Sequence, residues 1–331
     1  MFLGIDGGGS RLRLLLTDSD LHVVRYVEGG GVNTNFVPVQ EVHRAMEQAL
    51  DDCLPPDAAL DGVAMMVLGE AATLMRMLEK RATIRHMMAL SEAELGLMAG
   101  LAQTHGFLAL SGTGSDVFFM DGEKLEVIGG WGLLLGDEGS GTDIGQMGLR
   151  AAIRAHESWG ESTLLLDMLL DRWGVQRASL MRQMCEKVYA VPNPRSVVAS
   201  FARIVGEAAR LGDPVAIGIC RTAGHSMALQ MAALMKRVAA NTPDLSGYDI
   251  TLSGGSWRGS RHMFQSFEST LRATHPAARI VWPAYEPVAG AVACLAAAAG
   301  MDRDELARRM AANLGEFRYG PPEDWEIPSV I

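Results

Sequence analysis

The chain has 331 residues, with 29 Lys and Arg against 39 Asp and Glu, so its formal net charge is −10. The hydrophobic share of 48% indicates a folded protein, and this length suggests about two domains of ordinary size. The acidic balance argues against nucleic acid as a main partner, because a phosphate backbone needs a basic stripe. Glycine is abundant, with 37 residues, or about 11% where roughly 7% is usual.

The cysteines and apolar runs exclude further classes. No CxxC pair occurs, so the sequence predicts neither a disulfide framework nor a thiolate metal site. The longest apolar run, residues 289–301, is shorter than the roughly 18 residues that span a bilayer. The first residues do not resemble a signal peptide. We therefore expect a cytoplasmic protein that binds neither membrane nor nucleic acid.

Hydrophobic periodicity predicts strands and helices that alternate along the chain. The elements expected in the first third are a strand from Phe2 to the first glycine turn, strands at 12–16 and 21–27, a helix at 39–50, a strand at 63–68, a helix at 74–80, a strand at 86–90 and a helix at 91–101. Those expected afterwards are strands at 117–120, 125–128, 249–252 and 279–282, and helices at 143–156, 162–172, 180–189, 197–211, 214–241, 261–274, 287–299 and 302–314. This alternation predicts an α/β fold.

An internal repeat suggests how the chain divides. FLGIDGGGS at residues 2–10 matches FLALSGTGS at 107–115, an offset of 105 residues without a gap. Such similarity favours two related α/β domains, although two hairpins that share only turn chemistry are the alternative. The expected domains and tail are an N-terminal domain at 1–105 with helix 302–314 as a candidate to pack back on it, a C-terminal domain at 106–300, and a tail at 315–331.

The first glycine turn is a candidate anion site that joins two strands. Its residues are Asp6, Gly7, Gly8, Gly9, Ser10 and Arg11. Consecutive glycines let backbone N–H groups approach an anion, while Ser10 adds a hydroxyl and Arg11 a positive charge. Asp6 can hold Mg²⁺ through water, because Mg²⁺ takes few carboxylates and keeps several waters. The GxxxxGK[ST] loop is absent.

The second turn repeats this chemistry. Its residues are Gly112, Thr113, Gly114 and Ser115. Two such turns facing one another would hold one polyphosphate between them.

These turns, with GGWGLLLGDEGSG at residues 129–141, resemble the N-acetylglucosamine kinase-like branch of the BadF/BadG/BcrA/BcrD ATPase family, in the actin, Hsp70 and sugar-kinase superfamily. The resemblance extends from residue 2 to about residue 299. It implies two ribonuclease-H-like domains flanking a nucleotide cleft, with ATP and Mg²⁺ bound. It also implies an ATP-dependent kinase acting on a hydroxyl of an amino sugar or N-acetylated amino sugar, such as N-acetylglucosamine or glucosamine.

Further site residues follow from the resemblance. It assigns the two turns to phosphate, Asn33 to the sugar and Asp137 to a sugar hydroxyl. The adjacent carboxylate of Glu138 is a further candidate for the sugar. The residues that match the adenosine motif are Gly254, Gly255 and Ser256. The alternatives are structural: Asn33 is also a good turn residue, and Gly254 and Gly255 suit any turn from a strand to a helix.

The expected catalytic base departs from the family pattern. The family has an Asp at the start of the helix before the second turn, and this chain has Ser91-Glu92-Ala93-Glu94 there. Ser91 and Glu94 have the spacing of a capping box, which leaves Glu92 as the candidate base. A helix N-terminus favours the ionised carboxylate that a base requires. The alternative is that Glu92 only complements the helix dipole.

Other functions remain open. Within the superfamily, the chain could be an ATPase that drives conformational change in a partner protein, or a sugar or nucleotide sensor with weak catalysis. A repressor–kinase of the ROK type is disfavoured, because its zinc-binding cysteine cluster is missing. Apolar helices in the second half leave a homodimer open.

Overall fold

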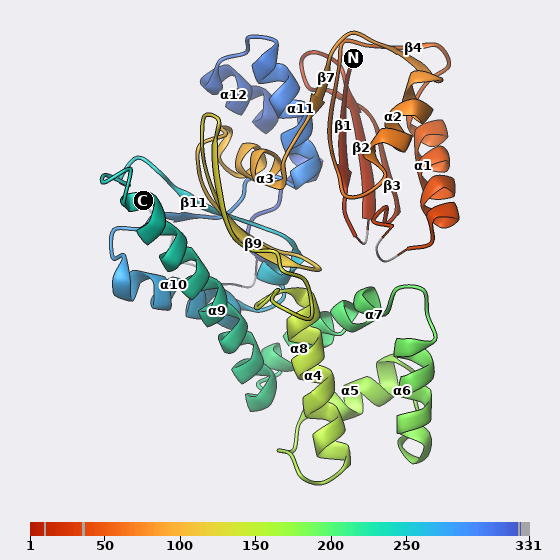
Figure 1. The fold of residues 1–331 in the computed structure, drawn as a ribbon, viewed down its shortest axis with the longest axis vertical. Coiled ribbons are helices and arrows are strands. Elements are labelled where there is room, and N and C mark those ends of the chain that lie inside the picture. The colour runs from red at the N-terminus through yellow and green to blue at the C-terminus, as the bar shows by residue number, and fades with distance from the viewer. Residues whose placement is uncertain (10, 35–36, 324, 326–331) are drawn as a thin grey trace. The chain divides into compact units, whose positions relative to one another are not determined.

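A computed structural model describes residues 1–9, 11–34, 37–323 and 325. The chain divides into two compact units (Figure 1). The first unit comprises residues 1–108, 120–124 and 281–320, and the second comprises residues 109–119, 125–280 and 321–331. The chain thus returns to the first unit at residue 281. The contacts thus group residues 281–320 with the first unit, whereas the sequence predicted a C-terminal domain that ends at residue 300.

The first unit contains a five-stranded sheet in the order β3-β2-β1-β5-β7. Its strands are β1 (Phe2–Gly7), β2 (Arg11–Thr17), β3 (Val23–Gly30), β5 (Gly62–Val67) and β7 (Met87–Ala89). β1 pairs with β2 in antiparallel and with β5 in parallel orientation, and β5 pairs in parallel with β7. The sequence did not predict a second, two-stranded sheet of β4 (Ala58–Leu60) and β6 (Ala82–Ile84).

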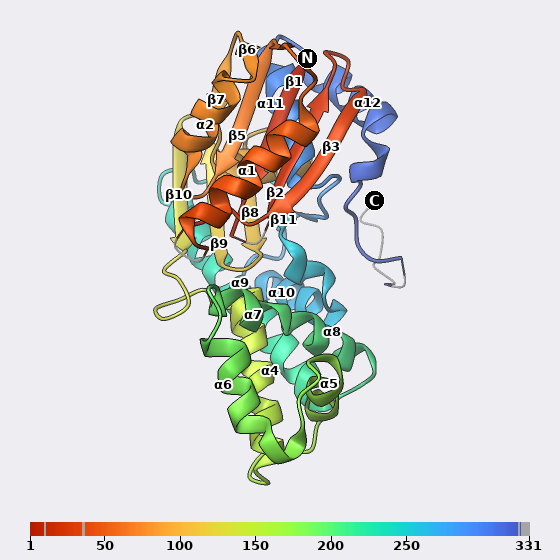
Figure 2. The same cartoon turned by 90° about the vertical axis from the view of Figure 1, so that its right-hand side faces the viewer.

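Helices cover both faces of this first sheet (Figure 2). They are α1 (Val39–Cys53), α2 (Ala71–Glu79), α3 (Glu92–Leu101), α11 (Pro287–Ala298) and α12 (Arg303–Asn313). Alternate residues of β1 belong to opposite cores, as the two-residue period of a strand requires. Leu3 packs in one core with Val42 of α1, whereas Phe2 packs in the other with Val292 of α11.

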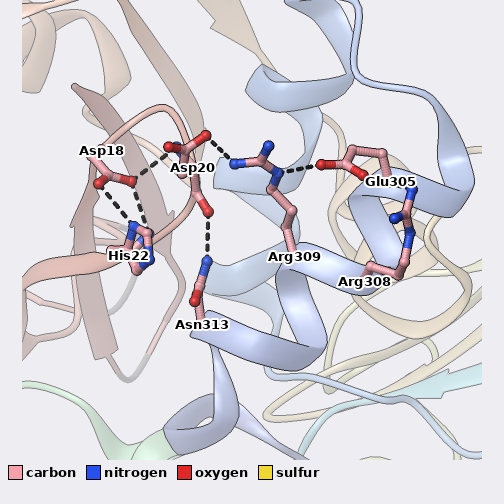
Figure 3. Close-up of polar contacts among 7 residues, drawn as sticks. All are labelled: Asp18, Asp20, His22, Glu305, Arg308, Arg309 and Asn313. Carbon is pink, nitrogen blue, oxygen red and sulfur yellow. Dashed lines mark hydrogen bonds and ion pairs between the residues drawn. The ribbon is translucent and has the colours of Figure 1, made fainter.

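Helix α12 is fixed to the turn between β2 and β3 by polar contacts (Figure 3). Arg309 donates to the Asp20 carboxylate, and Asn313 Nδ2 donates to the Asp20 carbonyl over 2.7 Å. The Asp18 carboxylate orders the turn by accepting from the backbone N–H groups of Asp20 and His22, each over 2.9 Å. The last described helix therefore belongs to the first unit.

A second five-stranded sheet has the order β10-β9-β8-β11-β12. Its strands are β8 (Gly106–Ser111), β9 (Ser115–Asp121), β10 (Lys124–Gly129), β11 (Ile250–Ser253) and β12 (Ile280–Val281). The helices of the second unit are α4 (Gly141–His156), α5 (Leu164–Arg172), α6 (Leu180–Tyr189), α7 (Pro194–Ser200), α8 (Ala202–Arg210), α9 (Pro214–Ala239) and α10 (Arg261–Thr274). The mixed α/β class is confirmed.

The helix expected at 197–211 is wrong as one element, because the chain breaks at the buried Phe201 between α7 and α8. Short 3-10 turns occur at Arg177–Ser179, Gly255–Arg258 and Gly315–Phe317. Among the described helices, none is long and apolar enough to cross a membrane.

Candidate functional site

The first glycine turn connects β1 and β2 and packs against the segment that follows β3. Gly8 N donates to Arg11 O over 2.9 Å, which closes the turn, and Val32 N donates to Gly8 O over 3.1 Å. Gly9 lies in the same turn, and Ser10 lies outside the described residues. The neighbouring Asn33 is 8% exposed. The structure therefore brings the candidate sugar residue Asn33 to the candidate phosphate turn.

Asp6 lies on β1 just before this turn and has a cationic neighbour that the sequence reasoning missed. Asp6 is opposite Arg13 in the register of β1 and β2, and the Arg13 Nη1 to Asp6 Oδ2 distance is 3.3 Å. Burial raises the pKa of Asp6, and the positive charge of Arg13 opposes this shift. The Arg11 side chain is more exposed than that of Arg13, and its Nη1 lies 3.3 Å from Glu28 Oε1. Hairpin register was the signal that could have identified Arg13.

The candidate base lies at the same edge of the sheet as this turn by topology. β1, β5 and β7 run parallel, so their carboxyl ends meet at one edge, where ligands of open α/β sheets bind. The first turn follows β1, Gly69 with a φ of +101° follows β5, and Glu92 follows β7.

Glu92 occupies the first position of α3 and is half-buried. The capping box beside it is confirmed: Ser91 Oγ accepts from Glu94 N over 3.2 Å, and Glu94 Oε2 accepts from Ser91 N over 2.7 Å. The capping box thus uses the Glu94 side chain. The partial positive charge at the helix N-terminus favours a negative charge on the Glu92 carboxylate.

The second glycine turn is fastened to the loop that contains Asp137 and Glu138. Ser115 Oγ donates to Glu138 O over 2.9 Å, and Thr142 Oγ1 donates to Thr113 O over 2.5 Å. The hydroxyl of Ser115, predicted to face phosphate, therefore orders the neighbouring loop. The Glu138 side chain is exposed.

The candidate adenosine motif contacts the same turn. Ser256 Oγ lies 3.4 Å from Gly112 O, and Gly141 N donates to that oxygen over 2.8 Å. Gly254 has a φ of +95°, and a Cβ there would lie 2.3 Å from Ser111 O. Only glycine fits so close an approach in that conformation. Gly255, the next residue, has open space where a Cβ would lie. Three motifs far apart in sequence thus form one network within the second unit.

Asp137 is only 3% exposed and has a left-handed φ of +62°. Its carboxylate is paired with the Arg195 guanidinium, which comes from the first turn of α7. A Cβ at Gly114 would lie 2.7 Å from Arg195 Nη2 and 3.2 Å from Asp137 Oδ2. The second glycine turn is therefore directly packed against this ion pair. Nothing local in the sequence pointed to Arg195.

A second carboxylate belongs to this cluster. Asp116 follows the second turn on β9, and burial, with the negative charge of Asp137, raises its pKa to about 6, while Arg195 opposes the shift. The sequence reasoning did not single out Asp116, although it directly follows the glycine turn.

Metal binding was expected at Asp6. In the described part of the chain, one group of three candidate ligands lies close together, and it is Asp18, Asp20 and His22 rather than Asp6 (Figure 3). Arg309 already engages Asp20. Asp6 offers a hard carboxylate oxygen beside a turn of backbone N–H groups, which fits one ligand of a largely hydrated Mg²⁺.

The model of the BadF/BadG/BcrA/BcrD ATPase family matches residues 3–295. An N-acetylmuramic acid/N-acetylglucosamine kinase of Clostridium acetobutylicum is 25% identical over 300 residues, which cover 88% of this chain and 96% of that protein.

Solved structures agree on the fold. A candidate N-acetylglucosamine kinase from Chromobacterium violaceum has a TM-score of 0.62 at 23% identity, and one from Porphyromonas gingivalis has 0.60 at 17%. In both cases the match covers 88% of this chain and 97% of the other. With the family match extending over most of its length, the chain belongs to the BadF/BadG/BcrA/BcrD ATPase family.

Proposed function

We propose that this protein is an ATP-dependent kinase that phosphorylates a hydroxyl of an amino sugar or an N-acetylated amino sugar. The observation that carries the proposal is the network of the second glycine turn, the Asp137 loop and the Gly254 motif within the second unit. A phosphate turn, a sugar loop and an adenosine motif in contact are what transfer from ATP to a sugar requires. The names of the relatives support the same substrate class.

In this proposal, two ribonuclease-H-like domains flank the nucleotide. Backbone N–H groups of the turns at residues 7–10 and 112–115 would hold its phosphates, apart from those of Gly8 and Gly112, which donate within the turns. Arg11 would add charge at the first turn. The residues at 254–256 would lie under the adenosine. Asp6 would hold hydrated Mg²⁺, which neutralises charge on the transferring phosphoryl group when it is bound.

Glu92 would act as the general base. It takes the proton of the sugar hydroxyl as that oxygen bonds to the γ-phosphorus, while the bond from this phosphorus to the bridging oxygen breaks and ADP leaves. Asn33, Asp137 and Glu138 would orient the sugar through its hydroxyl and amide groups. Such catalysis depends mainly on positioning.

The test is ADP release from ATP and Mg²⁺ in the presence of a panel that includes glucosamine, N-acetylglucosamine, N-acetylmuramic acid and glucose. We expect one amino sugar to accelerate ADP release by at least about tenfold, with the phosphorylated sugar as product. Hydrolysis that no sugar changes would instead favour the partner-driving ATPase. Sugar binding without ADP release would favour a sensor.

A further inference from the structure

Arg195 reaches the candidate sugar loop from a helix that no motif identified. It lies in the first turn of α7, directly after Pro194. The Asn193 side chain caps this helix by accepting from Ser196 N over 2.9 Å, which fixes the backbone from which Arg195 extends. Its guanidinium then pairs with Asp137, 58 residues earlier in the chain.

The ion pair is enclosed. The Arg195 side chain is 15% exposed and that of Asp137 is 3% exposed. Losing one partner of a buried pair leaves an uncompensated charge, which is more costly than losing both partners. Gly114 leaves room for the pair, because a Cβ there would lie 2.7 Å from Arg195 Nη2. The pair therefore has little freedom to take another arrangement.

The backbone of Asp137 is fixed as well. Its left-handed φ of +62° is uncommon for a residue with a side chain, and Ser140 N donates to Asp137 O over 3.0 Å. With the backbone held by this turn, the orientation of the carboxylate is set by its partner, Arg195.

Arg195 also balances a second charge. Asp116 and Asp137 repel one another, and the positive charge of Arg195 favours the ionised form of Asp116. Two carboxylates and one guanidinium thus share the space beside the second glycine turn. Without the guanidinium, the repulsion between the two carboxylates would no longer be opposed by a positive charge.

We propose that Arg195 is a positioning residue for sugar recognition, which holds the Asp137 carboxylate in the orientation that accepts a hydrogen bond from a sugar hydroxyl. The inference rests on the proposed function, since it needs a sugar at Asp137. It makes the helical segment around α7 part of the sugar site. Two other roles compete with this one. Arg195 could contact ATP directly, or its ion pair with Asp137 could serve only to stabilise the fold.

The experiment is a double-mutant cycle on the full chain, with variants Arg195→Met, Asp137→Asn and both together, and with Arg195→Lys as the conservative variant. The matched control is Arg182→Met, which removes an exposed arginine that lies 3.7 Å from Glu186 on α6. The KM for the best amino sugar, the KM for ATP and kcat are measured for each. Thermal unfolding of each variant checks that it folds.

We expect Arg195→Met to raise the sugar KM by roughly tenfold or more, with the ATP KM changed by less than about twofold. Arg195→Lys should recover part of the loss, because it keeps the positive charge but lacks the planar guanidinium. The double variant should resemble the worse single variant, since Arg195 acts through Asp137. It also removes both charges of the Arg195–Asp137 pair together, so neither of these two residues is left as an unpaired buried charge if a single variant fails to fold.

Other results would overturn the inference. A rise in the ATP KM alone would assign Arg195 to the nucleotide, and additive effects in the double variant would separate Arg195 from Asp137. A lower unfolding temperature of Arg195→Met with an unchanged sugar KM would show that Arg195 has only a structural role. A wild-type protein that phosphorylates no amino sugar would contradict the proposed function, which is a different result from active protein with an unaffected variant.

Discussion

The two glycine turns come from matching sequences, yet the structure uses them differently. Where the first has Asp6, the second has Ser111. Asp6 carries a charge that Arg13 partly balances at 3.3 Å, whereas Ser111 Oγ donates to Gly139 O over 2.7 Å inside a buried network. The first turn is therefore organised around a charge, and the second around hydrogen bonds to two other loops.

This difference suggests a division of labour. The charged turn suits a cation and the phosphates that accompany it, while the uncharged turn suits precise placement of neighbouring loops. In the second unit the charges stand beside the turn, on Asp116, Asp137 and Arg195. The repeat thus keeps the hairpin, and the change from Asp6 to Ser111 removes the charge at its start.

The largest expected effect follows from the crowding at the second turn. Gly254→Ala should lower the free energy of unfolding by roughly 2–6 kcal/mol, because φ is +95° and a Cβ would lie 2.3 Å from Ser111 O. Gly255→Ala is the matched control, since nothing lies within 4 Å of its Cβ position. Urea unfolding of both variants provides the measurement. Equal decreases in the free energy of unfolding of the two variants would show that the second turn can shift to accommodate a Cβ at residue 254.

The charge on the first turn gives the next effect. Asp6→Asn should reduce kcat/KM for ATP with Mg²⁺ by roughly 100-fold, because it removes the candidate cation ligand. Ser111→Ala, at the matching position, should lower the free energy of unfolding by about 1–3 kcal/mol, since Gly139 O loses a buried donor. The measurement is ADP release against Mg²⁺ concentration, alongside urea unfolding. Glu47→Gln, on the exposed side of α1, controls for loss of charge.

If Asp6→Asn changes neither the rate nor its dependence on Mg²⁺, the proposed contrast between a charged and an uncharged turn is wrong.

A smaller effect concerns pH. The pKa of Asp116 is about 6 in the folded protein against an ordinary value of 3.8, so the native state binds this proton more tightly. The contribution of this proton to the free energy of unfolding is fully present below pH about 4, and it is lost as the pH rises through about 6. On going from pH 4.5 to pH 7.5, the free energy of unfolding of Asp116→Asn should therefore rise by about 1 kcal/mol relative to that of the wild type. This figure allows for the partial exposure of Asp116.

Urea unfolding at both pH values measures this gain. Asp121→Asn, at the exposed end of the same strand, should show no such difference. If Asp116→Asn and the wild type differ in free energy of unfolding by the same amount at both pH values, ionisation of Asp116 is not the source of that difference.

Local patterns predicted much of the fold. The helices expected at 180–189 and 261–274 have those bounds in the structure, and the Ser91–Glu94 capping box is present. The break at Phe201 was missed because the apolar period continues through it. β4 and β6 have only three residues each, too few to show a period.

The candidate site was predictable only where its residues sit in local motifs. The glycine turns, Asn33 and Asp137 belong to recognisable segments. Arg195 meets Asp137 through the packing of α7, so no spacing in the sequence relates the two. Arg13 differs, because hairpin register alone places it opposite Asp6. Tertiary contacts between distant segments are what the sequence pattern lacks.

The most direct test of the account follows the phosphoryl group. Wild-type protein and Glu92→Gln are incubated with ATP, Mg²⁺ and amino sugars, and sugar phosphate is measured by mass spectrometry while ATP affinity is measured separately. We predict sugar phosphate from the wild type, and a kcat roughly 10²–10⁴-fold lower in the variant with unchanged ATP affinity. No sugar phosphate from the wild type, or full turnover by Glu92→Gln, would contradict the account.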